Sequence, residues 1–244
     1  MDSMIKAYKG FDKNMQCRGF QFEEGKSYEE PEAILCRKGF HACENPIDVF
    51  QYYAPGESIF RKVELENVSE MREKDSKVCG KKIKIGEEIS LRDMIREGVK
   101  IDIQTANGST SGDSSHAATS GDYSPAATSG NFSPAATSGY YSHAATSGNY
   151  SPAATSGDSS PAATSGNYSP AATSGKESIA AAIGRDSKAK STIGNWIVLA
   201  EYGAWNGKYC PVICVKCGKI DGEVLKPDVW YRLKNGEFEE VMDE

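Results

Sequence analysis

The feature that most constrains this chain is a repeat in which glycine returns at every ninth residue. From Gly112 to Gly184 the register never slips, and most units follow the pattern G-x-x-S-x-A-A-T-S. Residues 105–175 contain no Lys, Arg, Leu, Ile, Val or Met, so this segment cannot build a core from large aliphatic side chains. A fixed spacing of small residues is what stacked coils require, because each position then lies above its copy in the coil below.

A disordered linker is the alternative interpretation, because a polar composition leaves little apolar surface to offset the loss of chain entropy. A linker needs composition only, however, and does not need a strict register. Gly followed by Asp or Asn is also typical of turns, and Ala fits a narrow interior. The repeat therefore predicts a β-solenoid. One unit would make either a full coil of nine residues or, as we favour, half of an eighteen-residue coil, since nine residues are short for two strands and two turns.

Aromatic residues recur at the second position after the repeat glycines. They predict one ladder of stacked rings if the coil has nine residues, or two ladders on opposite faces if it has eighteen. Such rings can shield a thin coil, fill a seam between copies of the chain or bind a ligand, and the first two uses are favoured. The candidate interaction surface consists of Tyr123, Phe132, Tyr141, Tyr150 and Tyr168.

The two flanks have ordinary mixed compositions and predict small folded domains. Residues 1–104 read as an α+β domain, in which Asn45-Pro46 starts a helix to Tyr53 and Ser90 starts a second helix to about residue 97. Strands are expected over 5–10, 16–22, 58–68 and 81–86, with a turn over 25–30. Residues 195–244 contain three tight-turn signals between apolar runs: Asn206-Gly207, Asp221-Gly222 and Asn235-Gly236.

Together these segments predict a mainly β protein with a small α+β N-terminal domain. A nonapeptide-repeat β-solenoid, or β-roll, over 105–194 would follow, and a β-meander over 195–244 would cap it.

Charge and composition exclude several classes of protein. The chain has 28 Lys and Arg against 34 Asp and Glu and no strongly basic segment, which argues against a nucleic-acid-binding protein. No run of 18 apolar residues is present, and the first residues lack the apolar stretch of a secretion signal, so we expect a cytoplasmic protein without a membrane segment. The seven scattered cysteines are expected to be reduced.

Three cysteines near the C-terminus form the candidate metal cluster. Cys210, Cys214 and Cys217 have a spacing at which thiolates on a tight turn can bind zinc. A tetrahedral site needs a fourth ligand, for which Cys79 or His41 would have to be recruited. Small buried thiols are the favoured interpretation, and no metal or other cofactor is expected.

One N-terminal segment resembles an enzyme family. KGFHACENPIDVFQYY followed by SIFRKVEL is similar to the central strand and helix of ADP-ribosyltransferase folds, with His41 where those enzymes often place a Tyr. The resemblance implies a nucleotide or ADP-ribose site that includes His41, Tyr52 and Tyr53. No Glu can be assigned to the catalytic position, so a binding module is favoured over an enzyme.

Two further resemblances concern the repeat and the whole chain. SIAAAIGRDSKAKSTIG, residues 178–194, resembles the repeats of trimeric autotransporter adhesin heads, which implies a parallel β-roll and a trimer. The order AYKGF, CRGFQFEEGKSYEE, LCRKGFHACENPIDVFQYY, VCGKKIKIG, repeats, WIVLAE and DVWYRLKNGEFEEV resembles a family of uncharacterised proteins of bacteriophages and prophages of Gram-positive bacteria.

The phage resemblance implies a non-enzymatic accessory protein in the bacterial cytoplasm. Its expected role is to bind and sterically block a host defence component, for example a CRISPR effector, with a host protein or a second copy of the chain as partner. The alternative is a nucleotide-binding or ADP-ribosyltransferase-like module for which the repeat serves as an oligomerisation rod. A third hypothesis, an extracellular adhesin-like tip, is disfavoured because no export signal is seen.

Overall fold

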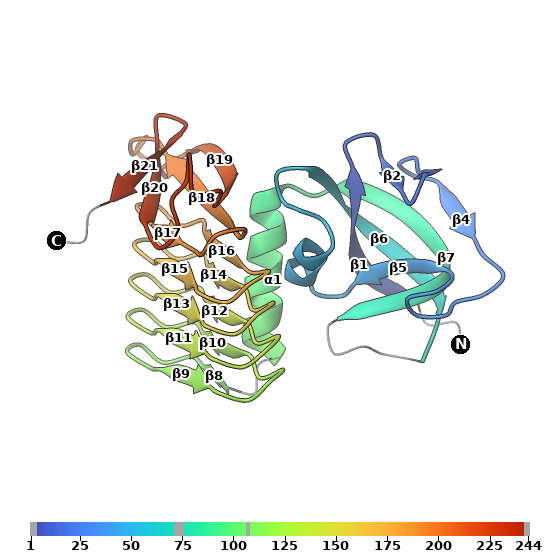
Figure 1. Ribbon diagram of the computed structural model, residues 1–244, viewed down its shortest axis with the longest axis horizontal. Coiled ribbons are helices and arrows are strands. Elements are labelled where there is room, and N and C mark those ends of the chain that lie inside the picture. Colours follow the sequence, from blue (N-terminus) through green and yellow to red (C-terminus); the bar gives the residue numbers. More distant parts are fainter. Residues whose placement is uncertain (1–3, 71–75, 106–107, 242–244) are drawn as a thin grey trace. The chain divides into compact units, whose positions relative to one another are not determined.

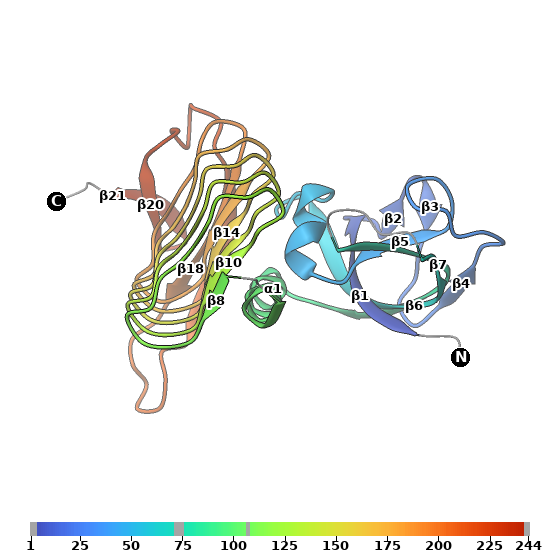
Figure 2. The ribbon, with the colours of Figure 1, turned by 90° about the horizontal axis from the view of Figure 1, so that it is seen from below.

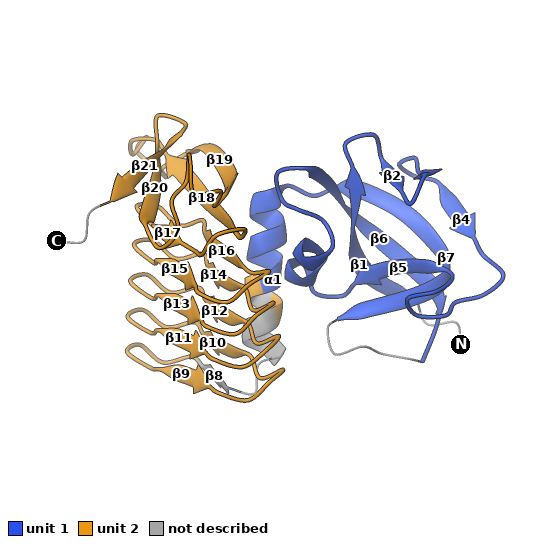
Figure 3. Cartoon of the chain, in the orientation of Figure 1, with its two compact units in different colours: residues 1–98 blue, residues 99–244 orange. Residues whose placement is uncertain are grey.

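A computed structural model describes residues 4–70, 76–105 and 108–241. The chain divides into two compact units, residues 1–98 and 99–244, which are coloured separately in Figure 3. Most of the regular structure is β-sheet, as the sequence predicts (Figure 1). Within the described ranges, no helix combines the length and the apolar character that crossing a membrane requires.

The first unit is built on a five-stranded antiparallel sheet in the order β4-β7-β5-β1-β6. Because β6 also pairs with β7, strands β7, β5, β1 and β6 close into a ring around fully buried Phe11, Leu65 and Ile83. The strands are β1 (Ile5–Asp12), β4 (Ser27–Glu29), β5 (Phe40–Cys43), β6 (Ser58–Val68) and β7 (Lys77–Glu88).

Two local predictions for this unit are wrong in part. The single strand expected over 16–22 is a two-stranded hairpin of β2 (Gln16–Cys17) and β3 (Phe20–Gln21), because Arg18 and Gly19 adopt left-handed backbone angles, φ 50° and 77°. The turn expected over 25–30 is present at Gly25 but does not extend further, because residues 27–29 form β4, which pairs with β7.

Both predicted helix starts are confirmed. Asn45 caps the 3-10 helix η1 (Pro46–Gln51), and its Oδ1 accepts a hydrogen bond from the Ile47 amide at 3.0 Å. Helix α1 (Leu91–Thr105) follows Ser90, whose Oγ accepts from the Asp93 amide at 3.1 Å. The second helix is longer than the sequence signals predict.

The repeat folds into the predicted β-solenoid, with a coil of eighteen residues, and the disordered alternative is wrong. Successive units contribute to two different seven-stranded sheets, so each strand pairs in parallel with the strand two units away, as in Ala126↔Ala144 and Ala135↔Ala153. In Figure 2 the coils lie one behind another along the axis. One sheet contains β8 (Gly108–Thr110), β10 (Ala126–Thr128), β12 (Ala144–Thr146), β14 (Ala162–Thr164), β16 (Ile179–Ala182), β18 (Trp196–Tyr202) and β19 (Val212–Lys219). The other contains β9 (Ala117–Thr119), β11 (Ala135–Thr137), β13 (Ala153–Thr155), β15 (Ala171–Thr173), β17 (Ala189–Lys190), β20 (Trp230–Lys234) and β21 (Glu237–Val241).

Hydrogen-bonded serines replace a large aliphatic core inside the coils. Ser151 is fully buried, and its Oγ accepts from the Ser133 amide at 2.9 Å while it donates to the Gly130 carbonyl oxygen at 3.0 Å. The Ser151 amide in turn donates to Ser169 Oγ at 3.0 Å. The column thus satisfies backbone groups that would be costly to bury without partners.

The C-terminal cap consists of two hairpins, one on each sheet. Strand β18 pairs in parallel with β16 and antiparallel with β19, while β20 pairs antiparallel with both β17 and β21. The interior changes from Ala to the larger Ile197, Leu199, Tyr231 and Leu233, which belong to the same buried cluster as the repeat alanines. The cap therefore closes the solenoid with side chains large enough to form an ordinary core.

The tight stacking of the glycine turns predicts a position-dependent cost for a single methyl group. A Cβ at Gly148 would collide with the carbonyl oxygen of Gly130 in the preceding coil, whereas at Gly121, in the first coils, the nearest atom is the Ser124 hydroxyl oxygen at 2.9 Å. We expect Gly148→Ala to lower the free energy of unfolding by roughly 2–3 kcal/mol, as overpacking does. Gly121→Ala is the matched control and should cost less than about 1 kcal/mol. Urea unfolding followed by circular dichroism measures both, and equal losses would contradict the stacked geometry.

Candidate functional site

A cavity of about 590 Å³ lies in the first unit, beside the place where β1 and β5 separate. The two strands pair only at Tyr8↔Cys43. At the neighbouring position, the Lys9 side chain spans the gap, and its Nζ donates a hydrogen bond to the His41 carbonyl oxygen at 2.9 Å. The Tyr53 ring lies so close to Gly10 that any Cβ there would collide with it. The opening between the strands is therefore held by side chains and not by a continued ladder of backbone hydrogen bonds.

His41 lines this cavity from β5 and is held in its neutral form. Its Nε2 accepts a hydrogen bond from the Cys36 amide at 2.8 Å, which places the ring proton on Nδ1. Burial lowers the pKa of His41, and the positive charges of Lys9, Arg18 and Lys77 lower it further. A neutral imidazole at this site can orient a ligand but holds no charge near neutral pH.

Tyr52 and Tyr53 line the same cavity from the end of η1. The Tyr53 hydroxyl lies 2.9 Å from Cys17 Sγ, and burial, together with this thiol, raises its pKa. Tyr52 is exposed, and its hydroxyl accepts a hydrogen bond from Lys77 Nζ at 3.1 Å. The structure thus brings together His41, Tyr52 and Tyr53, the three residues that the sequence nominates for a nucleotide site.

The charged side chains of the cavity lining are three cations and two carboxylates: Lys9, Arg18, Lys77, Glu29 and Glu30. The most buried of them, Lys9, is only 6% exposed and is not among the site residues predicted from the sequence. A signal for it exists, because Lys9 alternates with Ala7 and Phe11 on the buried face of β1. Burial lowers the pKa of Lys9, while the Cys17 thiol beside it acts in the opposite direction.

The predicted aromatic residues of the solenoid form two separate ladders, as an eighteen-residue coil requires. Tyr123 stacks on Tyr141 with ring centroids 5.4 Å apart. In the three-ring ladder, Phe132 stacks on Tyr150 at 5.1 Å and Tyr150 on Tyr168 at 4.9 Å, with interplanar angles of 6°. The three rings of the second ladder are exposed, with 58%, 49% and 39% of their surface accessible, in that order.

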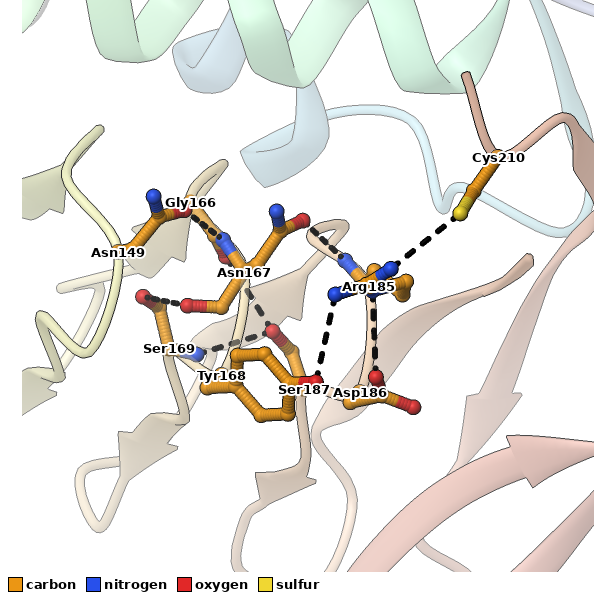
Figure 4. A network of polar contacts seen from close by, with 9 residues as sticks. All are labelled: Asn149, Gly166, Asn167, Tyr168, Ser169, Arg185, Asp186, Ser187 and Cys210. Atoms are coloured by element: carbon orange, nitrogen blue, oxygen red, sulfur yellow. Dashed lines mark hydrogen bonds and ion pairs between the residues drawn. The ribbon is translucent and has the colours of Figure 1, made fainter. Parts of the chain in front are cut away.

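Arg185 ends the three-ring ladder, as Figure 4 shows. Its Nη2 donates to the Tyr168 hydroxyl at 3.3 Å, and its guanidinium carbon lies 5.6 Å from the centroid of that ring. Nη1 donates to Cys210 Sγ at 3.2 Å, and Nε lies 3.3 Å from Asp186 Oδ2. The ladder is therefore bounded by a fixed cation, in an arrangement that favours cation–π attraction.

The three C-terminal cysteines do not come together as a metal cluster. Cys210 lies outside β19 and contacts Arg185, whereas Cys214 lies on β19 with its Sγ 3.8 Å from Glu201 Oε2. Cys217 is opposite Val198 in the antiparallel register. No group of three His, Cys, Asp or Glu side chains suited to a metal ion occurs in residues 4–70, 76–105 and 108–241.

Comparison with known proteins adds a family match to this unit. Residues 5–97 match the model of a family described as a domain of unknown function (DUF7666). No curated protein and no solved structure matches the chain. The matched segment includes every residue that lines the cavity.

The lowered pKa of His41 predicts how the stability of the first unit depends on pH. The ordinary histidine value is 6.5, and the folded-state pKa lies below it. As the pH falls below about 6.5, the unfolded chain binds a proton first, so the free energy of unfolding falls until the folded-state pKa is reached. Urea titrations between pH 7.5 and 5 should show this loss in the wild type and a smaller one in His41→Gln. His116→Gln, which removes an exposed histidine of the solenoid, should keep the wild-type pH dependence. An unchanged slope in His41→Gln would contradict the assignment.

Proposed function

We propose that residues 5–97 form a binding domain for a nucleotide of the ADP-ribose class. The observation that carries this proposal is that one cavity gathers His41, Tyr52 and Tyr53 with Lys9, Arg18 and Lys77. Its volume of about 590 Å³ falls within the range of small-molecule sites, roughly 300–1,000 Å³.

The lining of the cavity is chemically matched to such a ligand. Exposed Tyr52 offers a ring on which an adenine can stack. Arg18 and Lys77 supply positive charge for a pyrophosphate, and Glu29 and Glu30 supply acceptors for ribose hydroxyls. The activity proposed for this lining is binding of the nucleotide.

A second candidate function is favoured by the three-ring ladder of Phe132, Tyr150 and Tyr168. Large aromatic side chains that are exposed in a continuous row are typical of protein interfaces. This observation supports the role implied by the phage resemblance, in which an accessory protein in the bacterial cytoplasm binds a host defence protein, such as a CRISPR effector, and blocks it sterically. It equally supports a seam between copies of this chain, including the trimer implied by the adhesin-like segment.

Calorimetry tests the nucleotide proposal. ADP-ribose should bind the full chain, and Tyr52→Ala should weaken binding by about tenfold or more, because base stacking on an aromatic side chain contributes about 1–3 kcal/mol. Tyr209→Ala removes an exposed tyrosine of the second unit and should leave the affinity unchanged. Absence of heat with ADP-ribose and with NAD at millimolar concentration would overturn the proposal.

Substitution of the exposed ladder tests the second candidate. Serine already occupies this turn position at Ser114 and Ser159, with the same left-handed backbone, so a triple change to Ser at 132, 150 and 168 should leave the coil folded. The variant should lose the stoichiometric partner captured from a bacterial lysate, or its self-association in light scattering. Tyr123→Ser, in the other ladder, is the control. A wild-type chain that captures no partner and stays a 26.4 kDa monomer would contradict this function.

A further inference from the structure

The side chain of Lys9 ends in a buried amine. Binding of a nucleotide does not by itself explain why an amine is buried at this position. Its Nζ lies 5.5 Å from the centroid of the Phe11 ring and 6.0 Å from that of the Tyr53 ring. This nitrogen donates a hydrogen bond to a neutral carbonyl oxygen, that of His41. Nowhere in the described part of the chain does a carboxylate pair with it. Burial lowers the pKa of Lys9 and so raises the fraction of neutral amine, which is the nucleophilic form.

Groups that can supply a proton lie next to this amine. Cys17 contacts Lys9, and its Sγ lies 2.9 Å from the Tyr53 hydroxyl. Tyr53 keeps its proton near neutral pH, because burial and the contact with Cys17 raise its pKa. Lys9, Cys17 and Tyr53 all line the cavity, so an amine and two proton donors face a space that can hold a ligand.

The same cavity also offers charge for an anionic ligand. Arg18 and Lys77 line it together with Lys9, and the terminal ribose of an ADP-ribose-type ligand is a masked aldehyde. A ligand that carries both an aldehyde and a phosphate would therefore use the amine of Lys9 and the positive charges of Arg18 and Lys77.

We propose that Lys9 is the nucleophile of a carbonyl site and forms an imine with an aldehyde that carries a phosphate group, such as a reducing sugar phosphate. This inference rests on the proposed function only in that a ligand enters this cavity. It adds that the ligand carries an aldehyde group.

The step is balanced without an oxidant or a reductant. The lone pair of neutral Nζ forms a bond to the carbonyl carbon, and the carbonyl oxygen takes up a proton to become a hydroxyl group. The proton on this oxygen comes from the attacking nitrogen. The hydroxyl leaves as water after it receives a second proton from the Cys17 and Tyr53 pair, and the nitrogen returns its own second proton to the pair. The products are an imine and one water molecule, and hydrolysis reverses the reaction.

Trapping of the imine on the intact chain is the test. Pyridoxal 5′-phosphate serves as the probe, because it combines an aldehyde with a phosphate and its imine has a visible absorption band. Borohydride then reduces the imine to a stable secondary amine, and peptide mapping locates it. At pH 7 we expect labelling of Lys9 to exceed that of Lys6, an exposed lysine of the same strand, by on the order of tenfold, because burial lowers the pKa of Lys9 and leaves more of its amine unprotonated. Pyridoxal without the phosphate should label Lys9 more slowly.

Two variants complete the experiment. Lys9→Met should lose the imine band, whereas Lys6→Met, the matched control, should keep it. Because the comparison of Lys9 with Lys6 is made on the wild-type chain, it stands even if Lys9→Met fails to fold. Labelling of Lys9 no greater than that of Lys6 would overturn the proposal and leave Lys9 as a structural tie between β1 and β5.

The outcomes also separate this proposal from the nucleotide proposal. Selective labelling of Lys9 in a chain that gives no heat with ADP-ribose would support the carbonyl site and overturn the nucleotide ligand. Heat with ADP-ribose but unselective labelling would overturn the carbonyl site alone.

Discussion

The second unit depends on one constraint, which is that every buried backbone group of a narrow coil must find a hydrogen-bond partner without help from a large apolar core. The serine column meets it, since most of its hydroxyls join an amide eighteen residues earlier to a carbonyl twenty-one residues earlier, as in Ser151. This explains why the repeat tolerates no slip of register, because a shift by one residue would place a methyl group or a ring where the hydroxyl is needed. It also explains why aromatic rings lie outside on the turns, where they stack at about 5 Å.

The candidate site of the first unit lies where the regular pairing of two β-strands stops. Continued pairing of β1 with β5 beyond Tyr8↔Cys43 would close the cavity. Lys9 and Tyr53 occupy the gap instead, and an amine and a phenol are held in a buried position that costs stability. Local departures of this kind are typical of functional sites, since a fold selected only for stability would fill the gap with apolar side chains.

The sequence alone predicts the solenoid well because its signal is periodic and local. The nine-residue period leads to the eighteen-residue coil and to two ladders, and Asn45 marks a helix start through ordinary capping chemistry. Strand β5, only four residues long, carries no such pattern, and the left-handed Arg18 that turns β2 into β3 is not a typical turn residue. His41, Tyr52 and Tyr53 are predicted by resemblance. For Lys9 the sequence holds only its alternation with Ala7 and Phe11, which is a weak signal because its burial depends on which face of β1 the other strands cover. A charged residue in a strand predicts a solvent-exposed face, and only the pairing of distant strands shows when that face is buried.

We propose that a ligand of the ADP-ribose class binds where β1 and β5 separate and not on the solenoid. Chemical-shift mapping on the full isotope-labelled chain during titration with ADP-ribose tests it most directly. The account predicts that amide signals of residues 8–10, 39–43 and 52–53 move together and that those of the repeat stay unchanged. Shifts confined to the turns that carry Phe132, Tyr150 and Tyr168, or no shifts at saturating ligand, would contradict it.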